Sequence, residues 1–287
     1  MTVTLDTDWA DVLAFHAEAG VDVAIGEAAI DRFAESAAEA ARARSQPAPP
    51  AAKPPAAAQP PRPAAPSLPA PVGPALVNQA PDAAAMAARE AAREARSLEA
   101  LRAIMEGFEG CALKKTASRL VFADGNPQAQ VMFVGEAPGR EEDEQGLPFV
   151  GRSGRLLDLM LAAIGLDRTR AYIANVIPWR PPGNRTPTPQ ETAICLPFIR
   201  RQIELANPEV LVCLGGPSAQ ALLGTLEGIT RLRGRFMDFD TGTRTVRAIA
   251  TFHPAYLLRT PAGKRLAWRD MLAVEAALAE RAAGASS

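Results

Sequence analysis

Short apolar runs alternate with longer amphipathic segments in the second half of this chain, and no other feature constrains its fold as strongly. Four runs have the composition of buried strands: 131–134, 171–176, 210–214 and 246–251. Three segments between them have helical spacing: 154–164, 190–205 and 218–223. Strands that alternate with helices form a parallel sheet. We therefore predict an α/β fold with helices on both faces of a parallel sheet.

A segment able to carry chemistry follows each predicted strand. The first strand leads into 135–143 (Gly-Glu-Ala-Pro-Gly-Arg-Glu-Glu-Asp), where small residues turn the chain and leave backbone N–H groups free for a polar ligand. The others end at Asn175, at Gly215 and in 251–259 (Thr-Phe-His-Pro-Ala-Tyr-Leu-Leu-Arg). Because parallel strands carry ligands at their carboxyl ends, we expect one site there.

The composition is that of a soluble enzyme. With 287 residues, 48% of them hydrophobic, the chain can supply one substantial core. No apolar run approaches the roughly 18 residues of a membrane span, and the N-terminus lacks a secretory pattern. Three widely spaced cysteines do not make a disulfide framework. We expect a cytoplasmic protein with no membrane contact.

A stretch rich in proline and alanine divides the chain. Residues 47–74 hold 12 of the 26 prolines and 9 alanines, so 21 of 28 positions cannot build a core. We predict a helical element over 1–45, which would dock on a partner protein or on the chain's own catalytic domain, and a disordered linker over 46–81. Apolar residues recur on one helix face from 82 to 106, which predicts a lead-in helix to a catalytic domain over 82–280.

The net charge of −1 hides an asymmetry between the two parts. Residues 1–110 carry 9 basic and 15 acidic side chains, a net of −6, whereas residues 111–287 carry 22 and 17, a net of +5. An excess of arginine beside a candidate site is what binding to a phosphate backbone requires. Scattered surface arginine is common, so the charge supports a nucleic-acid partner without establishing one.

The segments 135–143 and 251–259 resemble the two signature motifs of the family 4 uracil-DNA glycosylases, enzymes that remove uracil from DNA. The resemblance runs from about residue 111 to 271 and includes Leu-Pro-Phe-Val-Gly-Arg at 147–152, Ile-Ala-Asn-Val at 173–176 and Arg-Pro-Pro-Gly-Asn-Arg at 180–185. It implies a three-layer α/β/α sandwich around a four-stranded parallel sheet. It also implies a monomeric, monofunctional hydrolase that initiates base excision repair on DNA containing uracil.

Uracil in a duplex must be flipped into a pocket that reads its edge and clamps its face. By resemblance, Asn175 would hydrogen-bond the uracil edge, Phe149 would stack on the base, and the backbone at Gly135 would complete the cradle. An asparagine side chain can both donate and accept, and cytosine presents the opposite pattern. The alternatives are that Asn175 caps a strand end and that Phe149 is a core ring.

Bond cleavage separates an oxocarbenium-like sugar from a uracil anion, which the site must stabilise. By resemblance, His253 would donate a hydrogen bond to uracil O2 as a neutral imidazole; its alternative role is to cap the turn before Pro254. A carboxylate must position the attacking water. Glu136, Glu142 and Asp143 are the candidates, with Glu136 expected in the pocket and either of the others near the water.

The remaining candidates contact DNA. In the second motif, Tyr256, Leu257, Leu258 and Arg259 would enter the minor groove, with an apolar wedge filling the gap left by the flipped base and Arg259 on a phosphate. One of the two leucines could instead be buried at the start of a helix. Further candidate contacts are Asn184, Arg185 and Lys264.

Family 4 enzymes usually hold a four-iron, four-sulfur cluster with four cysteines, and here the sequence departs from the pattern. The matching positions are Phe108, Cys111, Trp179 and Cys195. Because iron-sulfur clusters are bound by thiolates, Phe and Trp cannot replace the missing two. We expect no cluster, with Cys111 and Cys195 as vestiges and Cys213 as a small core residue.

Two functions from other classes stay open. One is a damage-sensing DNA-binding protein that keeps the pocket but has lost efficient turnover. The other is an adaptor in which the N-terminal element carries the biology. The intact Glu136, Asn175 and His253 favour an enzyme over both.

Overall fold

The computed structural model describes residues 81–284, and at their centre lies a mixed six-stranded sheet. Its order is β1-β3-β2-β4-β6-β5. The four inner strands are parallel: β3 (Tyr172–Asn175), β2 (Val131–Gly135), β4 (Val210–Leu214) and β6 (Thr245–Thr251). The α/β fold and the four parallel strands therefore agree with the sequence analysis.

Antiparallel strands at both edges make the sheet larger than the four strands expected. These are β1 (Asp124–Gly125), which pairs with β3, and β5 (Phe236–Asp240), which pairs with β6. The turn between β5 and β6 is closed by a hydrogen bond from the Thr241 N–H to the Arg244 carbonyl, 2.9 Å long. Neither edge strand was predicted from the sequence, because β1 has two residues and β5 is a five-residue strand with two exposed aspartates, too short for a clear pattern.

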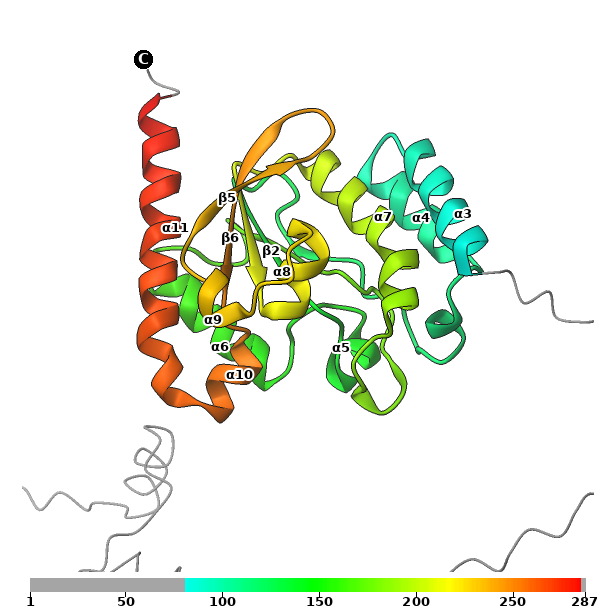
Figure 1. Cartoon of the computed structure of the whole chain (residues 1–287), viewed down its shortest axis with the longest axis horizontal. Coiled ribbons are helices and arrows are strands. Elements are labelled where there is room, and N and C mark those ends of the chain that lie inside the picture. Colours follow the sequence, from blue (N-terminus) through cyan, green and yellow to red (C-terminus); the bar gives the residue numbers. More distant parts are fainter. Residues whose placement is uncertain (1–80, 285–287) are drawn as a thin grey trace, which may run out of the picture. The chain divides into compact units, whose positions relative to one another are not determined.

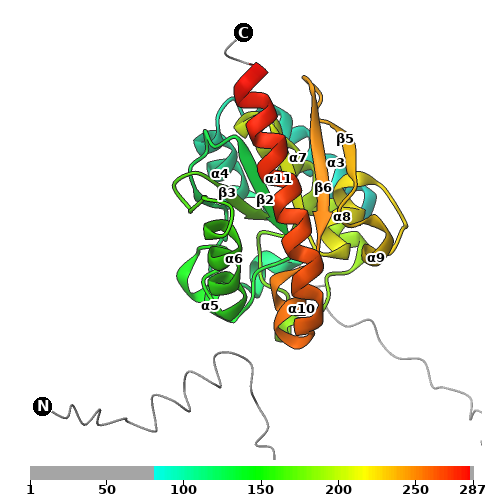
Figure 2. The same cartoon turned by 90° about the vertical axis from the view of Figure 1, so that its left-hand side faces the viewer.

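Helices cover both faces of the sheet (Figures 1 and 2). On one face lie α7 (Pro189–Ala206) and α8 (Gly216–Leu223); on the other lie α6 (Arg152–Ala162) and α11 (Lys264–Gly284). Successive residues of β2 point alternately into the two cores, Met132 into the first and Phe133 into the second. All five residues of β2 are buried, as expected for a strand covered on both sides.

Two helices replace the single lead-in helix expected over 82–106. They are α3 (Pro81–Glu94) and α4 (Leu98–Gly107), and they lie beside α7 in Figure 1. The break occurs at Ser97, whose side chain accepts a hydrogen bond from the Ala100 N–H at 3.2 Å and caps α4. Such a cap contributes about 1 kcal/mol to helix stability. Ala88 and Ala95, fully buried, allow the close approach of this pair to the core.

The remaining elements are short. They are α5 (Arg140–Gln145), α9 (Ile229–Leu232), α10 (Pro254–Arg259) and the 3₁₀ turns η1 (Ala112–Lys115), η2 (Pro182–Asn184) and η3 (Pro261–Gly263). The helical element expected over 1–45 and residues 46–80 of the linker expected over 46–81 lie outside the described residues, and Pro81, the last residue of that linker, begins α3. Within residues 81–284, no helix combines the length and the apolarity needed to cross a membrane.

The strand register brings the four parallel carboxyl ends into line. Gly135 at the end of β2 is opposite Asn175 at the end of β3, and Leu214 of β4 is opposite Thr251 of β6. The segments that follow these strands therefore start at one edge of the sheet, where ligands bind in folds of this kind.

Candidate active site

A pocket of about 610 Å³ opens at this edge of the sheet. Segments that follow all four parallel strands line it, which brings together the candidates expected from the sequence: Glu136, Phe149, Asn175, Gly215 and His253. The volume lies within the range of small-molecule sites. The single site expected at the strand ends is therefore present in the described part of the chain.

The packing of two pocket-lining side chains depends on Gly135, which does not itself line the pocket. A Cβ atom at Gly135 would collide with Oδ1 of Asn175 and with the ring of Phe149, so only glycine allows the three to lie together. Asn175 is 5% exposed and Phe149 is 4% exposed. The Phe149 ring stacks on His253, with centroids 5.5 Å apart and planes inclined by 28°. Both expected base-binding side chains therefore reach the pocket.

His253 combines the two roles that the sequence left open. Its Nδ1 accepts a hydrogen bond from the Ala255 N–H at 3.1 Å and so caps α10. That bond assigns the neutral tautomer in which Nε2 carries the hydrogen. Burial, together with the positive charge of Arg259 and against the opposing effect of Glu142, lowers the pKa of His253 to about 4. At neutral pH the side chain is therefore an uncharged donor through Nε2.

Glu142 and Asp143 both accept hydrogen bonds from the backbone. Glu142 accepts from the N–H groups of Val150 and Gly151 through Oε1, both at 3.1 Å, and from that of Gly139 through Oε2 at 3.0 Å. Asp143 accepts from the N–H groups of Ser118 and Arg119 at 2.8 and 3.3 Å, and it does not line the pocket. In this structure the two carboxylates hold loops together.

Glu136 differs from these two acids. Like Glu142 it lines the pocket, and burial raises the pKa of its carboxyl group above the ordinary value of 4.5. Among residues 81–284 its carboxylate has no hydrogen-bond partner, whereas its backbone carbonyl accepts from the Ile177 N–H at 2.9 Å. A half-buried carboxylate with free oxygens can hold a water molecule.

The leucine pair of the second motif is divided between core and surface. Leu257 is 1% exposed and packs with Phe252 and Ala267, whereas Leu258 is 37% exposed. Tyr256 packs on Phe252 with ring centroids 4.9 Å apart. Arg259 is exposed at the pocket rim, and Lys264 is exposed at the start of α11.

The loop between β3 and α7 forms another side of the pocket. Asn184 and Arg185 line it, and each already has a partner. Asn184 accepts a hydrogen bond from Arg180 at 2.7 Å. Arg185 makes a two-point ion pair with Glu191 at 2.6 and 2.8 Å, and Glu191 also caps α7 through the Thr188 N–H. The ion pair between Arg185 and Glu191 therefore holds this loop next to the pocket.

Among the apolar residues that line the pocket, Phe252 and Ile229 were not candidates in the sequence analysis. Phe252 directly precedes His253 inside the second motif, and that position could have revealed it. Ile229 belongs to α9, which carries no motif, so no local signal pointed to it.

The positions that match the family's cluster ligands are closely packed. Sγ of Cys111 and Sγ of Cys195 are 3.9 Å apart, and both residues are fully buried. Their hydrogen bond lowers the pKa of Cys111 and, together with burial, raises that of Cys195. Trp179 is 2% exposed, and Phe108 packs edge-on against Phe198 at 5.0 Å. With two thiols and two aromatic rings that offer no thiolate, this donor set does not fit a four-cysteine cluster.

Cys213 is separate from that pair. It lies fully buried in β4, and burial raises the pKa of its thiol to about 12. A buried thiol of this kind packs as a small apolar residue. Its position agrees with the expectation of a core residue.

Comparison with known proteins agrees with this site. The family model described as the uracil DNA glycosylase superfamily matches residues 122–272. The type-4 uracil-DNA glycosylase of Archaeoglobus fulgidus is 44% identical over 155 residues, 53% of this chain and 78% of that protein. The enzyme of the same name from Thermotoga maritima is 45% identical over 150 residues, 52% and 77% of the two chains. That of Sulfurisphaera tokodaii is 35% identical over 179 residues, 61% and 81%. The chain therefore belongs to the type-4 family of the uracil DNA glycosylase superfamily.

Proposed function

We propose that this protein is a uracil-DNA glycosylase. It flips uracil out of DNA, hydrolyses the N-glycosidic bond and leaves an abasic site, the first step of base excision repair. The observation that carries this function is the convergence of Glu136, Phe149, Asn175 and His253 in one pocket at the strand ends. Membership of the type-4 family supports the same reaction.

Asn175 is proposed to select the base. Its amide can donate to uracil O4 and accept from N3–H, whereas cytosine offers a donor and an acceptor at the corresponding positions. Phe149 supplies an aromatic face for stacking, and the backbone after Gly135 supplies N–H groups. Since the Asn175 side chain is almost fully buried, a mismatched base would leave buried polar groups unpaired, which is costly.

His253 and Glu136 are proposed to perform the chemistry. Cleavage leaves the bonding electrons on the base as a uracil anion, and the Nε2–H of His253 donates a hydrogen bond to its O2. The hydrogen bond at Nδ1 orients the ring for this purpose. Glu136 holds the water that attacks the sugar carbon, accepts the proton that this water loses as the C–O bond forms, and offsets the positive charge on the sugar. Glu142 and Asp143 are proposed to act on the same step through the loops that they hold.

The rim of the pocket is proposed to grip DNA. Leu258, the exposed member of its pair, is the wedge that fills the gap left by the flipped base, while the buried Leu257 anchors α10. Tyr256, Arg259 and Lys264 contact the adjoining backbone. Asn184 and Arg185 approach DNA from the opposite loop, where Glu191 already orients the guanidinium.

The enzyme is proposed to work without a four-iron, four-sulfur cluster, because only Cys111 and Cys195 remain of the four thiolates. It is also proposed to lack lyase activity, since no lysine lies in the segments that line the pocket. Iron content and lyase activity can each be measured independently of uracil excision.

The test of the function uses the purified full chain and a labelled oligonucleotide with a single uracil. Alkali converts an abasic site into a strand break, so breakage that depends on uracil is the expected result. Matched oligonucleotides with cytosine or thymine at that position should stay intact. Binding to the uracil oligonucleotide without breakage would favour the damage-sensing alternative, and absence of both would favour the adaptor.

We also propose the division into an N-terminal element over 1–45, a linker over 46–81 and a catalytic domain over 82–280, in a monomeric, cytoplasmic protein. A Pro/Ala-rich sequence contributes little to a packed core. Deletion of residues 1–74 should leave excision on short oligonucleotides within a few-fold of the full chain. An insoluble or inactive truncation would assign the N-terminal element to the catalytic domain, and light scattering would report the mass in solution.

A further inference from the structure

Phe149 adopts a backbone conformation that its surroundings must maintain. Its φ of 55° lies in the left-handed region, which is rare for a bulky aromatic residue. Conformations of this kind persist only where the neighbouring structure imposes them. A Cβ atom at Gly154, in the first turn of α6, would collide with the Phe149 carbonyl, so the segment also presses closely against that helix.

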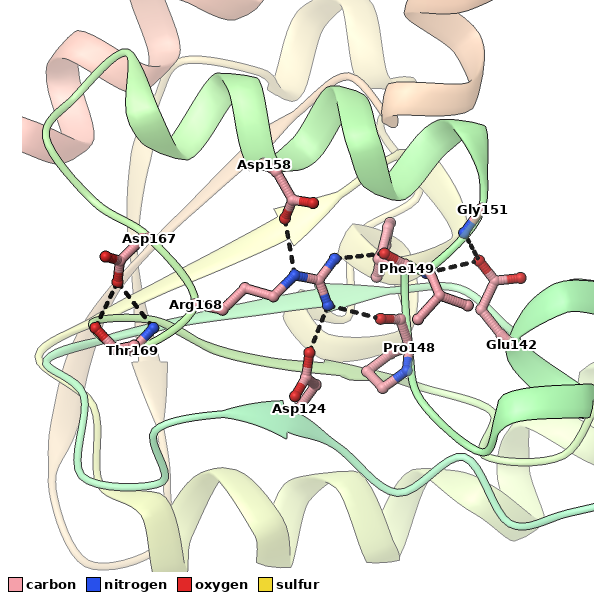
Figure 3. A network of polar contacts seen from close by, with 10 residues as sticks. Asp124, Glu142, Pro148, Phe149, Gly151, Asp158, Asp167, Arg168 and Thr169 are labelled. Atoms are coloured by element: carbon pink, nitrogen blue, oxygen red, sulfur yellow. Dashed lines mark hydrogen bonds and ion pairs between the residues drawn. The ribbon is translucent and has the colours of Figure 1, made fainter.

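Arg168 supplies much of that constraint, although it lies outside every motif. Its guanidinium donates to the carbonyl of Phe149 and, at 3.2 Å, to the carbonyl of Pro148 (Figure 3). The guanidinium also donates hydrogen bonds to the carboxylates of Asp158 in α6, at 2.8 Å, and Asp124 in β1, at 2.5 Å. The arginine therefore ties the segment to a helix and to an edge strand at once.

Glu142 holds the same segment from its other side, through the N–H groups of Val150 and Gly151 (Figure 3). The guanidinium of Arg168 thus binds the carbonyls of Pro148 and Phe149, and the carboxylate of Glu142 binds the next two N–H groups along the chain. This arrangement fixes the peptide planes on both sides of the Phe149 Cα atom. Those planes set the direction of the Cα–Cβ bond of Phe149, whose ring lies against Gly135 and His253.

We propose that Arg168 is a positioning residue for uracil excision: it holds the left-handed Phe149 so that its ring can face the flipped base. The proposal rests on the function proposed above. Arg168 touches neither the pocket nor the reacting atoms, and it acts through the 148–151 segment. The planar guanidinium of Arg168 bonds four oxygen atoms at once, and the ammonium group of a lysine cannot reproduce this arrangement.

Single-turnover excision rates test the proposal. Arg168→Ala should slow excision by about a hundred-fold, the usual cost of a displacement of about 1 Å in a reacting complex. Arg168→Lys should fall between this variant and the wild type. Arg170→Ala is the matched control, because Arg170 also bonds a carbonyl, that of Gly165, but is exposed and is not among the residues that line the pocket. Its rate should equal that of the wild type.

A double-mutant cycle separates positioning from a general loss of structure. If Arg168 acts through the ring, Arg168→Ala should cost at most a few-fold once Phe149→Ala is present. An equal cost in both backgrounds, or no cost in either, would overturn the proposal. Should Arg168→Ala fail to fold, as judged by circular dichroism, the cycle is run with Arg168→Lys and judged by the same criterion.

Amide hydrogen exchange supplies a reading that needs no activity. Exchange in the peptide covering 147–153 should accelerate in Arg168→Ala and stay unchanged in Arg170→Ala, while α7 and α11 keep their protection. Unchanged protection in 147–153 would contradict the proposed clamp even in an inactive protein. A wild-type chain that leaves uracil intact would refute the proposed function, and the exchange result would still decide the role of Arg168.

Discussion

Two clusters of reactive side chains, one in the pocket and one around Cys111 and Cys195, use their polar groups in opposite ways. In the pocket, His253 uses Nδ1 within the protein and keeps Nε2–H free, whereas the side chains of Asn175 and Glu136 have no hydrogen-bond partner among residues 81–284. Around Cys111 and Cys195, the side chains satisfy one another and the spaces are filled by aromatic rings. The first arrangement needs particular atoms in particular places, whereas the second needs mainly volume.

This difference teaches how an active site and a structural site tolerate substitution. A packed cluster can exchange thiolates for hydrocarbon as long as the volume is filled, because close packing is what stabilises it. A site that must stabilise a developing charge cannot make such an exchange, since the donor has to sit where the charge appears. Rates should therefore depend on the pocket, and stability on the cysteine region.

The largest effect is expected in the pocket. Asn175→Ala and His253→Ala should each lower the excision rate by about a hundred- to a thousand-fold, with little change in secondary structure. His253→Asn is informative because asparagine still caps a helix, so stability should recover while the rate stays low. Gln128→Ala, which removes an exposed amide distant from the pocket, is the control. Wild-type rates in both alanine variants would refute the site assignment.

The next effect concerns pH. Burial raises the pKa of Glu136 above 4.5, whereas His253 becomes protonated only near pH 4. As the pH falls, Glu136 is therefore neutralised first, and the excision rate should decline through a midpoint above 4.5. Glu136→Gln should lower the plateau by about a hundred-fold and abolish this limb of the rate profile. If the excision rate of that variant declined at low pH as in the wild type, a group other than Glu136 would be responsible for the titration.

The smallest effect on rate is expected in the cysteine region. Cys111→Ser combined with Cys195→Ser should keep the excision rate within a few-fold and lower the free energy of unfolding by about 1 to 3 kcal/mol. Cys213→Ser is the matched control, a buried thiol outside the pair. Iron analysis after anaerobic purification should find much less than one iron per chain. A stoichiometric cluster in fresh protein would remove the contrast between the two regions and leave the glycosylase assignment intact.

The parts of the fold that the sequence predicted are those with strong local patterns. β2 and β4 are apolar throughout, β6 is apolar except for Arg247 and its terminal threonines, and α7 begins at Pro189, after a capping box at Thr188 and close to its expected start. The edge strands carried no such pattern. The division of 82–106 into two helices depends on the single cap at Ser97, which an unbroken apolar periodicity conceals.

The sequence by itself determined which chemical groups the site contains and that parallel strands would carry them to one edge, because strand periodicity and motif order are local. Only the tertiary structure decided how each group is used. Glu142 accepts N–H groups from residues eight and nine positions away, Asp143 from residues 24 and 25 positions away, and Arg168 reaches Asp124 across 44 positions. Three acids that look alike in one motif thus differ in their free lone pairs, and those are set by partners that only folding brings together.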